Sequence, residues 1–182
     1  DLRVFVQALP NDLDEIADAG RRKQLFVQVV LPQVLRLNEA IRADRARLIA
    51  IGKTPVNVRS TANAEWLVAL ALQYRASPTD HQSLLGRVDV VPPSLAIAQG
   101  AIESGWGTSR FAIAGNALFG QRTFDPNGAG FRPKDVEDPN FKVRRFESLM
   151  GSIWGYMITL NTHPAHAVFR ERRARMRRQR DA

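Results

Sequence analysis

The sequence contains no cysteine, and this absence excludes several kinds of site. No disulfide can form, and neither a thiolate nucleophile nor a zinc site of the cysteine type can exist. Long apolar runs are also missing, since nothing approaches the roughly 20 consecutive apolar residues that span a bilayer as a helix. With 45% hydrophobic and 24% charged residues, the 182-residue chain has the composition of a globular protein and not of a disordered one.

Acidic residues are fewer than basic ones, and the imbalance is concentrated at the C-terminus. The formal net charge is +8, and residues 170–182 carry +5 of it, through seven arginines against Glu171 and Asp181. Such a run attracts polyanions, including anionic lipids and wall polymers. Because no aromatic side chain is interleaved for base stacking, nucleic acid is not an expected partner. The alternative is an ordinary structural helix, with Phe169 and Met176 buried.

Apolar periodicity predicts helices in the first half of the chain. Apolar residues recur at three- and four-residue steps through residues 20–52, which is typical of an amphipathic helix. Pro32 should end or kink this stretch, so a helix is expected before it and a longer one over residues 35–50. Another amphipathic helix is expected over residues 63–74. These segments are interpreted as packing elements without a catalytic role.

The second half combines helices with a small irregular region. Two prolines open a helix expected over residues 93–104. A stretch rich in glycine and proline follows at residues 115–139, and short β-like runs are expected at 119–124 and 141–146. A further helix is expected over residues 149–160. The predicted fold class is therefore mainly α (α+β), with a small irregular or β lobe inserted after the central helix.

Glu103 lies at the end of this central helix, which Gly105 is placed to stop in a left-handed conformation. An apolar face adjoins the carboxyl. Partial burial there, together with the dipole of the helix C-terminus, would favour the protonated form that a general acid requires. The preceding turns carry small or polar side chains beside Glu103, which leaves room for a ligand: Gln99, Gly100 and Ala96.

Trp106 stands between two glycines, so its ring is expected to remain accessible. An aromatic face beside an acidic group suits a sugar ring, whose C–H faces are apolar and whose edges are polar. Taken alone, a glutamate at a helix end is usually a surface residue, and a tryptophan is usually part of a core. Their combination with the residues that follow changes this interpretation.

The blocks Glu103-Ser-Gly-Trp-Gly-Thr-Ser109 and Gly115-Asn-Ala-Leu-Phe-Gly120 resemble the signature of glycoside hydrolase family 73. These are N-acetylglucosaminidases with a lysozyme-like fold. The resemblance extends to the bacterial Bax-type proteins of this family and covers most of residues 20–175. The segments that carry it are Arg22–Phe26, Leu31-Pro32, Val88–Ser94 and Leu160–His163.

The resemblance implies a domain organisation and a set of site residues. Residues 1–84 would form an N-terminal helical region that packs on the core, residues 85–170 the glucosaminidase catalytic core, and residues 171–182 an Arg-rich C-terminal tail. Residues at the matching positions would serve the active site, as follows: Glu103 is the catalytic acid, Trp106 a cleft aromatic, Tyr156 a tyrosine facing the cleft, and Phe119 and Gly120 part of its floor.

Asn116 matches a polar position of the motif and is expected to bind substrate. The next residue departs from the family, which often has a second asparagine where this chain has Ala117. A polar contact to the substrate is therefore expected to be missing, while the acid is retained.

A second carboxylate is needed by most glycosidases, about 5–5.5 Å from the acid for retention or about 6.5–9.5 Å for inversion. The family points to the irregular lobe before residues 141–146, where Glu137 fits best. Asp125, Asp135 and Asp138 compete, although aspartates next to proline or glycine are explained by turns. The acetamido group of the substrate is an alternative nucleophile.

His163 and His166 have a spacing found in metal sites, but Pro164 lies between them and no third ligand is obvious. A loop or capping role is therefore the preferred interpretation, and neither a metal nor another cofactor is expected.

The predicted function is hydrolysis of the β-1,4 bond after N-acetylglucosamine in the peptidoglycan glycan strand, with Glu103 donating a proton. Two alternatives remain: a lytic transglycosylase that uses the same glutamate, and a non-catalytic module for wall binding or assembly. The expected location is the periplasm or cell envelope, although no export signal is visible in the sequence.

Overall fold

The computed structural model describes residues 5–123, 128–132, 138 and 141–180. The chain divides into two compact units, each built from separate stretches of sequence. One comprises Asp1–Leu37 and Pro92–Tyr156, and the other comprises Asn38–Val91 and Met157–Ala182. This division differs from the three consecutive segments expected from the sequence, because two helices each contribute residues to both units.

Helix α1 (Ala19–Gly52) is a single helix of 34 residues with Pro32 inside it. The expected end of the helix at Pro32 is therefore wrong. One apolar stripe continues through the helix, and its burial outweighs the roughly 3 kcal/mol that an interior proline costs. In the same turn, Nε2 of Gln33 donates to the carbonyl of Val29 at 3.2 Å. The fully buried residues of the stripe are Phe26, Val30, Val34, Ile41 and Leu48.

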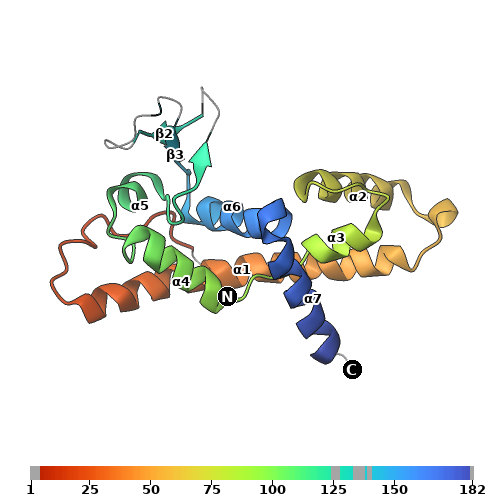
Figure 1. Ribbon diagram of the computed structural model, residues 1–182, viewed down its shortest axis with the longest axis horizontal. Helices are drawn as coiled ribbons and strands as arrows, with labels where there is room; N and C mark the ends of the chain where they lie inside the picture. The colour runs from red at the N-terminus through yellow and green to blue at the C-terminus, as the bar shows by residue number, and fades with distance from the viewer. Residues whose placement is uncertain (1–4, 124–127, 133–137, 139–140, 181–182) are drawn as a thin grey trace. The chain divides into compact units, whose positions relative to one another are not determined.

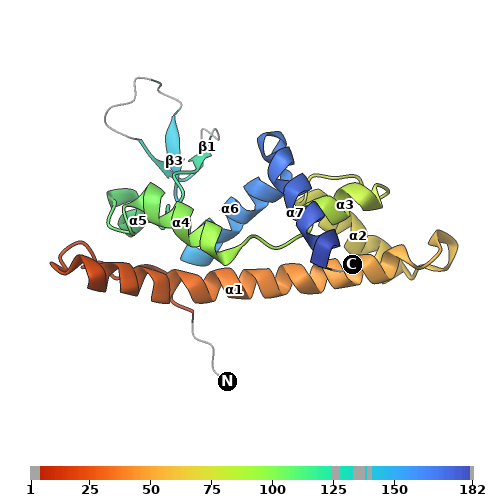
Figure 2. The ribbon, with the colours of Figure 1, turned by 60° about the horizontal axis from the view of Figure 1, so that its bottom comes forward.

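The first unit contains the start of α1, helices α4 (Pro93–Ser104) and α5 (Arg110–Gly115), a small sheet and most of α6 (Leu149–Thr162). Helix α4 has the bounds predicted from its prolines and Gly105, whereas α5 was not predicted. Figures 1 and 2 both show the sheet beyond α4 and α5, on the side away from α1.

The sheet has three short strands: β1 (Arg122–Thr123), β2 (Gly130–Phe131) and β3 (Lys142–Arg144). Strand β3 is central and pairs antiparallel with both neighbours, in the order β1-β3-β2. Strands β1 and β3 fall inside the two predicted β-like runs. The predicted mainly α class with a small β lobe after the central helix is thus confirmed, and it is consistent with a lysozyme-like glucosaminidase fold.

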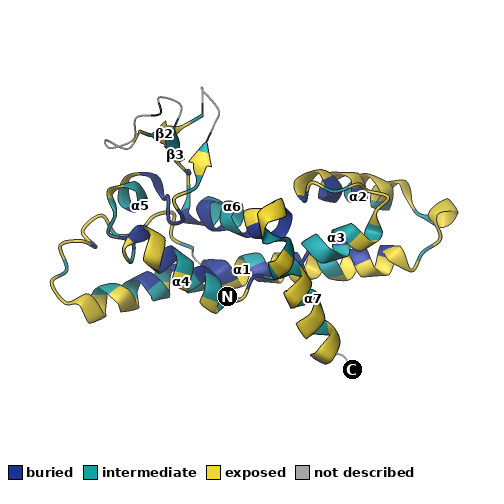
Figure 3. Ribbon diagram, in the orientation of Figure 1, coloured by how far each residue is buried: buried dark blue, intermediate teal, exposed yellow. Residues whose placement is uncertain are grey.

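The second unit contains α2 (Thr61–Gln73), α3 (His81–Arg87) and α7 (Ala167–Arg180), together with the rest of α1 and α6. Helix α2 agrees with the prediction, and α3 was missed. Figure 3 shows that α7 is largely exposed, in contrast to α6. Among the described residues, no helix has both the length and the apolar character needed to cross a bilayer. Two 3-10 turns complete the unit: η1 (Val56–Val58) and η2 (Pro164–His166).

A buried carboxylate, Asp89, ties α7 to the rest of the second unit. Asp89 is 2% exposed and forms ion pairs with Arg45, Arg173 and Arg177. Arg173 also donates to Oδ1 of Asn161 at 2.7 Å. Burial lowers the pKa of Arg173 to about 10, and the charge of Asp89 opposes this shift.

The Arg-rich segment therefore lies in a helix that has a structural face. Arg173 and Arg177 belong to that face, whereas Arg172, Arg175 and Arg178 are exposed. The burial expected of Met176 if this helix were structural is not found, since Met176 is 57% exposed. Phe169 is half-buried beneath the guanidinium of Arg173, which lies 5.0 Å from its ring centroid.

Candidate active site

Glu103 lies in the last turn of α4, and the helix ends at Gly105 with φ 59° and ψ 44°. The residue is exposed, so the partial burial considered from the sequence is absent. Its neighbours Ala101 and Ser104 are buried and fix this end of the helix. The carboxyl is therefore open to a substrate, and any removal of water from it would come from the substrate itself.

The backbone after α4 makes an unusual turn of three residues with positive φ. The angles are 59° at Gly105, 60° at Trp106 and 83° at Gly107. The backbone of Trp106, a residue with a Cβ, is strained in this left-handed region, at a cost of order 1 kcal/mol or more. Oγ of Ser104 holds the turn by accepting a hydrogen bond from the amide of Gly107 at 2.8 Å.

Trp106 is positioned by the first turns of α1. Its ring meets Phe26 edge to face, with centroids 5.8 Å apart and planes at 77°. Nζ of Lys23 lies 5.1 Å from the centroid of the same ring. Because Trp106 is only half-buried, the turn presents part of its ring beside Glu103.

Phe119 and Tyr156 form a stacked pair, with centroids 4.1 Å apart and planes at 4°. Phe119 is 8% exposed and packs against α4 at Gly100, where a Cβ would lie 3.4 Å from its Cε1. Burial, and then the negative charge of Glu103, raise the pKa of Tyr156 to about 12. The hydroxyl of Tyr156 is thus neutral at physiological pH and lies within electrostatic reach of Glu103.

Gly120 brings the backbone close to the acid. Its φ is 56°, and a Cβ at this position would lie 3.7 Å from Oε2 of Glu103. The next residue, Gln121, packs on α6, since a Cβ at Gly155 would lie 2.9 Å from its Nε2. The sequence singled out Gly120 but missed Gln121, whose position depends on a helix more than 30 residues away.

Asn116 contributes to the frame of this region. It caps α5 with φ 53°, and its Nδ2 donates to the carbonyl of Phe146 at 3.2 Å. It is 9% exposed, and its contact with a substrate stays a prediction. Ala117, where the family often has asparagine, is 3% exposed, and its amide donates to the carbonyl of Phe111 at 3.1 Å.

Three of the four candidates for the second carboxylate, Glu137, Asp125 and Asp135, lie outside the described residues. Asp138 is described and exposed, and its carbonyl accepts from the amide of Phe141 at 3.1 Å, as expected of a turn residue. The assignment of Glu137 therefore stays a prediction.

His163 has a capping role, because its Nδ1 accepts a hydrogen bond from the amide of Ala165 at 3.2 Å. Its ring centroid lies 6.0 Å from that of His166. Across the part of the chain that is described, no group of three or more histidine, aspartate or glutamate side chains is arranged to hold a metal ion.

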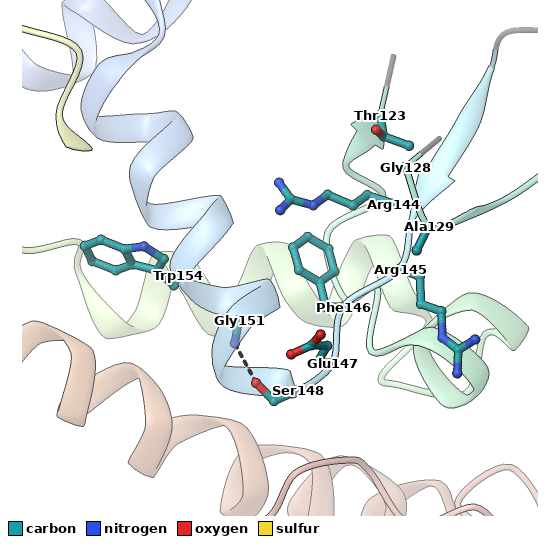
Figure 4. Close-up of a pocket in the computed structure, with 10 residues that line it drawn as sticks. All are labelled: Thr123, Gly128, Ala129, Arg144, Arg145, Phe146, Glu147, Ser148, Gly151 and Trp154. Carbon is teal, nitrogen blue, oxygen red and sulfur yellow. Dashed lines mark hydrogen bonds between the residues drawn. The ribbon is translucent and has the colours of Figure 1, made fainter. Parts of the chain in front are cut away.

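A pocket of about 660 Å³ lies between the small sheet and the start of α6, and none of the described site residues predicted from the sequence lines it (Figure 4). Its walls include Arg144, Phe146, Glu147 and Trp154. Glu147 also lines a second pocket of about 280 Å³ beside Asn116. The only signal for this pocket in the sequence is the proximity of Trp154 to Tyr156 in one helix.

Comparison with known proteins agrees with the resemblance seen in the motifs. The model of the glucosaminidase family, described as mannosyl-glycoprotein endo-beta-N-acetylglucosaminidase, matches residues 80–181. The chain is also 33% identical over 173 residues to Protein bax of Escherichia coli (strain K12). That match covers 92% of this chain and 61% of the relative, so the chain spans about three fifths of the relative's length. No solved structure gives a significant match. The family model covers more than half of the chain, which therefore belongs to the glucosaminidase family, as a Bax-type member.

Proposed function

We propose that this chain is a peptidoglycan hydrolase, an N-acetylglucosaminidase that cleaves the β-1,4 bond after N-acetylglucosamine with Glu103 as its general acid. The observation that carries the proposal is the local environment of the Glu103 carboxylate. The backbone of Gly120 approaches it closely, and Tyr156 lies within its electrostatic reach. Membership of the glucosaminidase family supports a glycan of the cell wall as the substrate.

In this mechanism each described residue has a distinct task. Glu103 donates its proton to the oxygen of the leaving sugar as the glycosidic bond breaks, and positive charge develops on the other sugar. The half-exposed ring of Trp106 offers an apolar surface to a sugar face. Tyr156, which remains protonated, supplies a neutral hydroxyl for hydrogen bonding beside the acid, and Phe119 supports its ring.

We assign the second carboxylate to Glu137, which would position water or stabilise the positive charge of the transition state. Glu137→Gln should then reduce turnover more than Asp125→Asn, Asp135→Asn or Asp138→Asn. Equal effects of all four substitutions would favour the acetamido group of the substrate as the nucleophile.

We further propose that the enzyme acts in the periplasm or cell envelope. The exposed arginines Arg172, Arg175 and Arg178 would contact an anionic wall or membrane surface, while Arg173 and Arg177 hold the helix in place. This contact would concentrate the protein on its substrate without taking part in the chemistry.

The test is digestion of purified peptidoglycan, followed by reduction and mass analysis of the fragments. New reducing ends on N-acetylglucosamine are expected. Ends that carry 1,6-anhydro-muramyl groups would identify a lytic transglycosylase and contradict the proposal. An intact wall, with a folded protein that still binds it, would indicate a non-catalytic module.

A further inference from the structure

The pocket in Figure 4 combines charges of both signs with aromatic walls. The close-up shows the guanidinium of Arg144 pointing from the sheet towards α6, with Glu147 below it and Phe146 between them, and with the ring of Trp154 on the other side of α6 in this view. The guanidinium carbon of Arg144 lies 4.8 Å from the centroid of Phe146, so the aromatic ring supports its position. At about 660 Å³, the pocket has the size of a typical site for a small ligand.

Among the described residues, Arg144 is held by an aromatic ring and not by an ion pair. Within the part of the chain that the structure describes, no carboxylate lies within 4.0 Å of its guanidinium, the distance that defines an ion pair. The backbone of Arg144 is fixed, because its amide donates to the carbonyl of Gln121 at 2.7 Å. A planar guanidinium held in this way is suited to bind a carboxylate through two hydrogen bonds.

The pocket adjoins the Glu103 site through two shared elements. The backbone of Gly120 lies close to the acid, and the carbonyl of the next residue, Gln121, accepts a hydrogen bond from the amide of Arg144 in the wall of the pocket. Helix α6 carries Tyr156 near the acid, and at its Gly155 a Cβ would meet the side chains of both Gln121 and Phe146, a wall residue of the pocket. A glycan bound at Glu103 would therefore have its neighbouring substituents next to the pocket.

We propose that this pocket binds the peptide substituent of the wall glycan, a short peptide that carries both carboxylate and amino groups. Arg144 binds a carboxylate, Glu147 binds an amino group, and Trp154 packs on the peptide backbone or its apolar parts. A glycan made of N-acetylglucosamine alone has no charged group, and a peptide-free muramyl sugar has a carboxylate for Arg144 but no amino group for Glu147. Recognition of both charges therefore favours the peptide. This inference rests on the proposed function, because it deepens the choice of substrate at the same site.

The test compares two soluble probes in the inactive Glu103→Gln background, where binding is measured without cleavage. One probe is a disaccharide–peptide fragment prepared from bacterial wall, and the other is a peptide-free disaccharide of N-acetylglucosamine, which carries no charged group. Arg144→Gln is expected to weaken binding of the peptide-bearing probe about tenfold, or about 1.4 kcal/mol, as for loss of one charge-assisted hydrogen bond. Binding of the peptide-free probe should change less than twofold.

Arg110→Gln is the matched control. Arg110 is exposed in the same unit and lies 4.9 Å from the ring of Phe111, but it does not line the pocket. It should change neither affinity, and thermal unfolding should show that both variants are folded. An equal loss for the two probes, or no loss for either, would overturn the peptide pocket. A selective loss together with a wild-type protein that leaves the wall intact would overturn the hydrolase and retain the pocket.

Discussion

Two acidic residues of this chain, Glu103 and Asp89, occupy opposite environments. Glu103 is exposed at the end of α4, close to the backbone of Gly120 and within electrostatic reach of Tyr156. Asp89 is 2% exposed and is surrounded by Arg45, Arg173 and Arg177. The first carboxylate is open to a ligand, and the second is saturated by the protein.

The difference separates a carboxylate suited to chemistry from one suited to structure. A general acid must exchange its proton with a substrate, so access matters more than a fixed partner. A buried carboxylate surrounded by guanidinium groups pairs with their charges, and its removal leaves buried positive charge without a partner. Substitution of the two residues should therefore affect different properties of the protein.

The largest expected effect is the loss of activity in Glu103→Gln. This change keeps the shape of the side chain but removes the transferable proton, so turnover of wall glycan should fall by at least about 10²-fold. The thermal unfolding midpoint should be unchanged or slightly higher. Activity is measured by the release of reducing ends from purified peptidoglycan.

Glu65→Gln is the control for this prediction, because Glu65 is an exposed glutamate of α2 in the other unit. It should retain wild-type turnover. Wild-type turnover in Glu103→Gln would instead end the assignment of this residue as the acid.

The opposite outcome is expected for Asp89→Asn, which should reduce stability and leave the chemistry intact. Arg173 would lose its buried partner, and breaking such a pair costs about 3–5 kcal/mol. Chemical denaturation measures the loss, and activity per folded molecule should stay near that of the wild type. Asp80→Asn is the control, since Asp80 is the exposed N-cap of α3 and asparagine caps a helix as well as aspartate. A similar small change in both variants would show that the Asp89 cluster contributes little.

Of these two carboxylates, the sequence predicted the position of Glu103 but not the role of Asp89. The position of Glu103 followed from local rules, because prolines start α4 and Gly105 stops it. The role of Asp89 depends on Arg173 and Arg177, more than 80 residues away, and no local pattern predicts such a contact. From the sequence, these arginines were therefore interpreted as part of a charged tail.

Three other features of the structure also differ from the predictions made from the sequence. Pro32 was expected to end a helix, but the buried stripe of α1 continues through it. Short helices such as α5 were missed because six residues carry too little periodicity to be recognised. The pocket wall of Arg144 and Trp154 is assembled from a strand and a helix, so its residues are not a sequence motif.

A smaller effect, on stability, is expected from a substitution in the turn after Glu103. Gly107 has φ 83°, and a Cβ there would lie 2.5 Å from Cδ1 of Leu9. Gly107→Ala should therefore destabilise the protein by about 2 kcal/mol, from backbone strain and the steric clash. Gly86→Ala is the control, because nothing lies within 4 Å of a Cβ in that helix, and it should stabilise by up to about 1 kcal/mol. Denaturation midpoints that move in the same direction for both variants would contradict this account of the turn.

A weaker and salt-dependent effect is expected on the exposed face of α7. The triple variant Arg172→Gln, Arg175→Gln, Arg178→Gln should bind intact wall about tenfold less tightly at low salt. The difference should shrink as salt rises, because exposed charges are screened beyond about 8 Å at physiological ionic strength. Cleavage of a short soluble glycan should be unchanged, since it does not depend on attachment to a surface.

Deletion of residues 172–182 should behave differently, because it also removes Arg173 and Arg177 from Asp89. This truncation is expected to lower the thermal unfolding midpoint markedly. If the triple variant also lost stability, the exposed arginines would be structural and the attachment surface would be wrong.

The smallest expected effect tests the electrostatic link between Glu103 and Tyr156. Burial and the charge of Glu103 raise the pKa of Tyr156 from 10.0 to about 12, so the neutral hydroxyl is favoured by folding. The unfolded chain releases this proton near pH 10, so the stabilisation is complete below that pH and is lost as pH rises towards 12. Glu103→Gln removes the smaller of the two causes, and the pKa of Tyr156 should fall by part of the shift.

Absorbance at 295 nm follows the formation of tyrosinate, and the chain has only two tyrosines. Burial also raises the pKa of the other, Tyr74, so Tyr156 should ionise first. At pH 11, Glu103→Gln should contain more tyrosinate than the wild type, while circular dichroism verifies that both remain folded. Tyr156→Phe should abolish this difference, and Glu65→Gln should titrate like the wild type. Identical curves for Glu103→Gln and the wild type would mean that the acid and the tyrosine do not sense one another, and Tyr156 would then have no place in the proposed site.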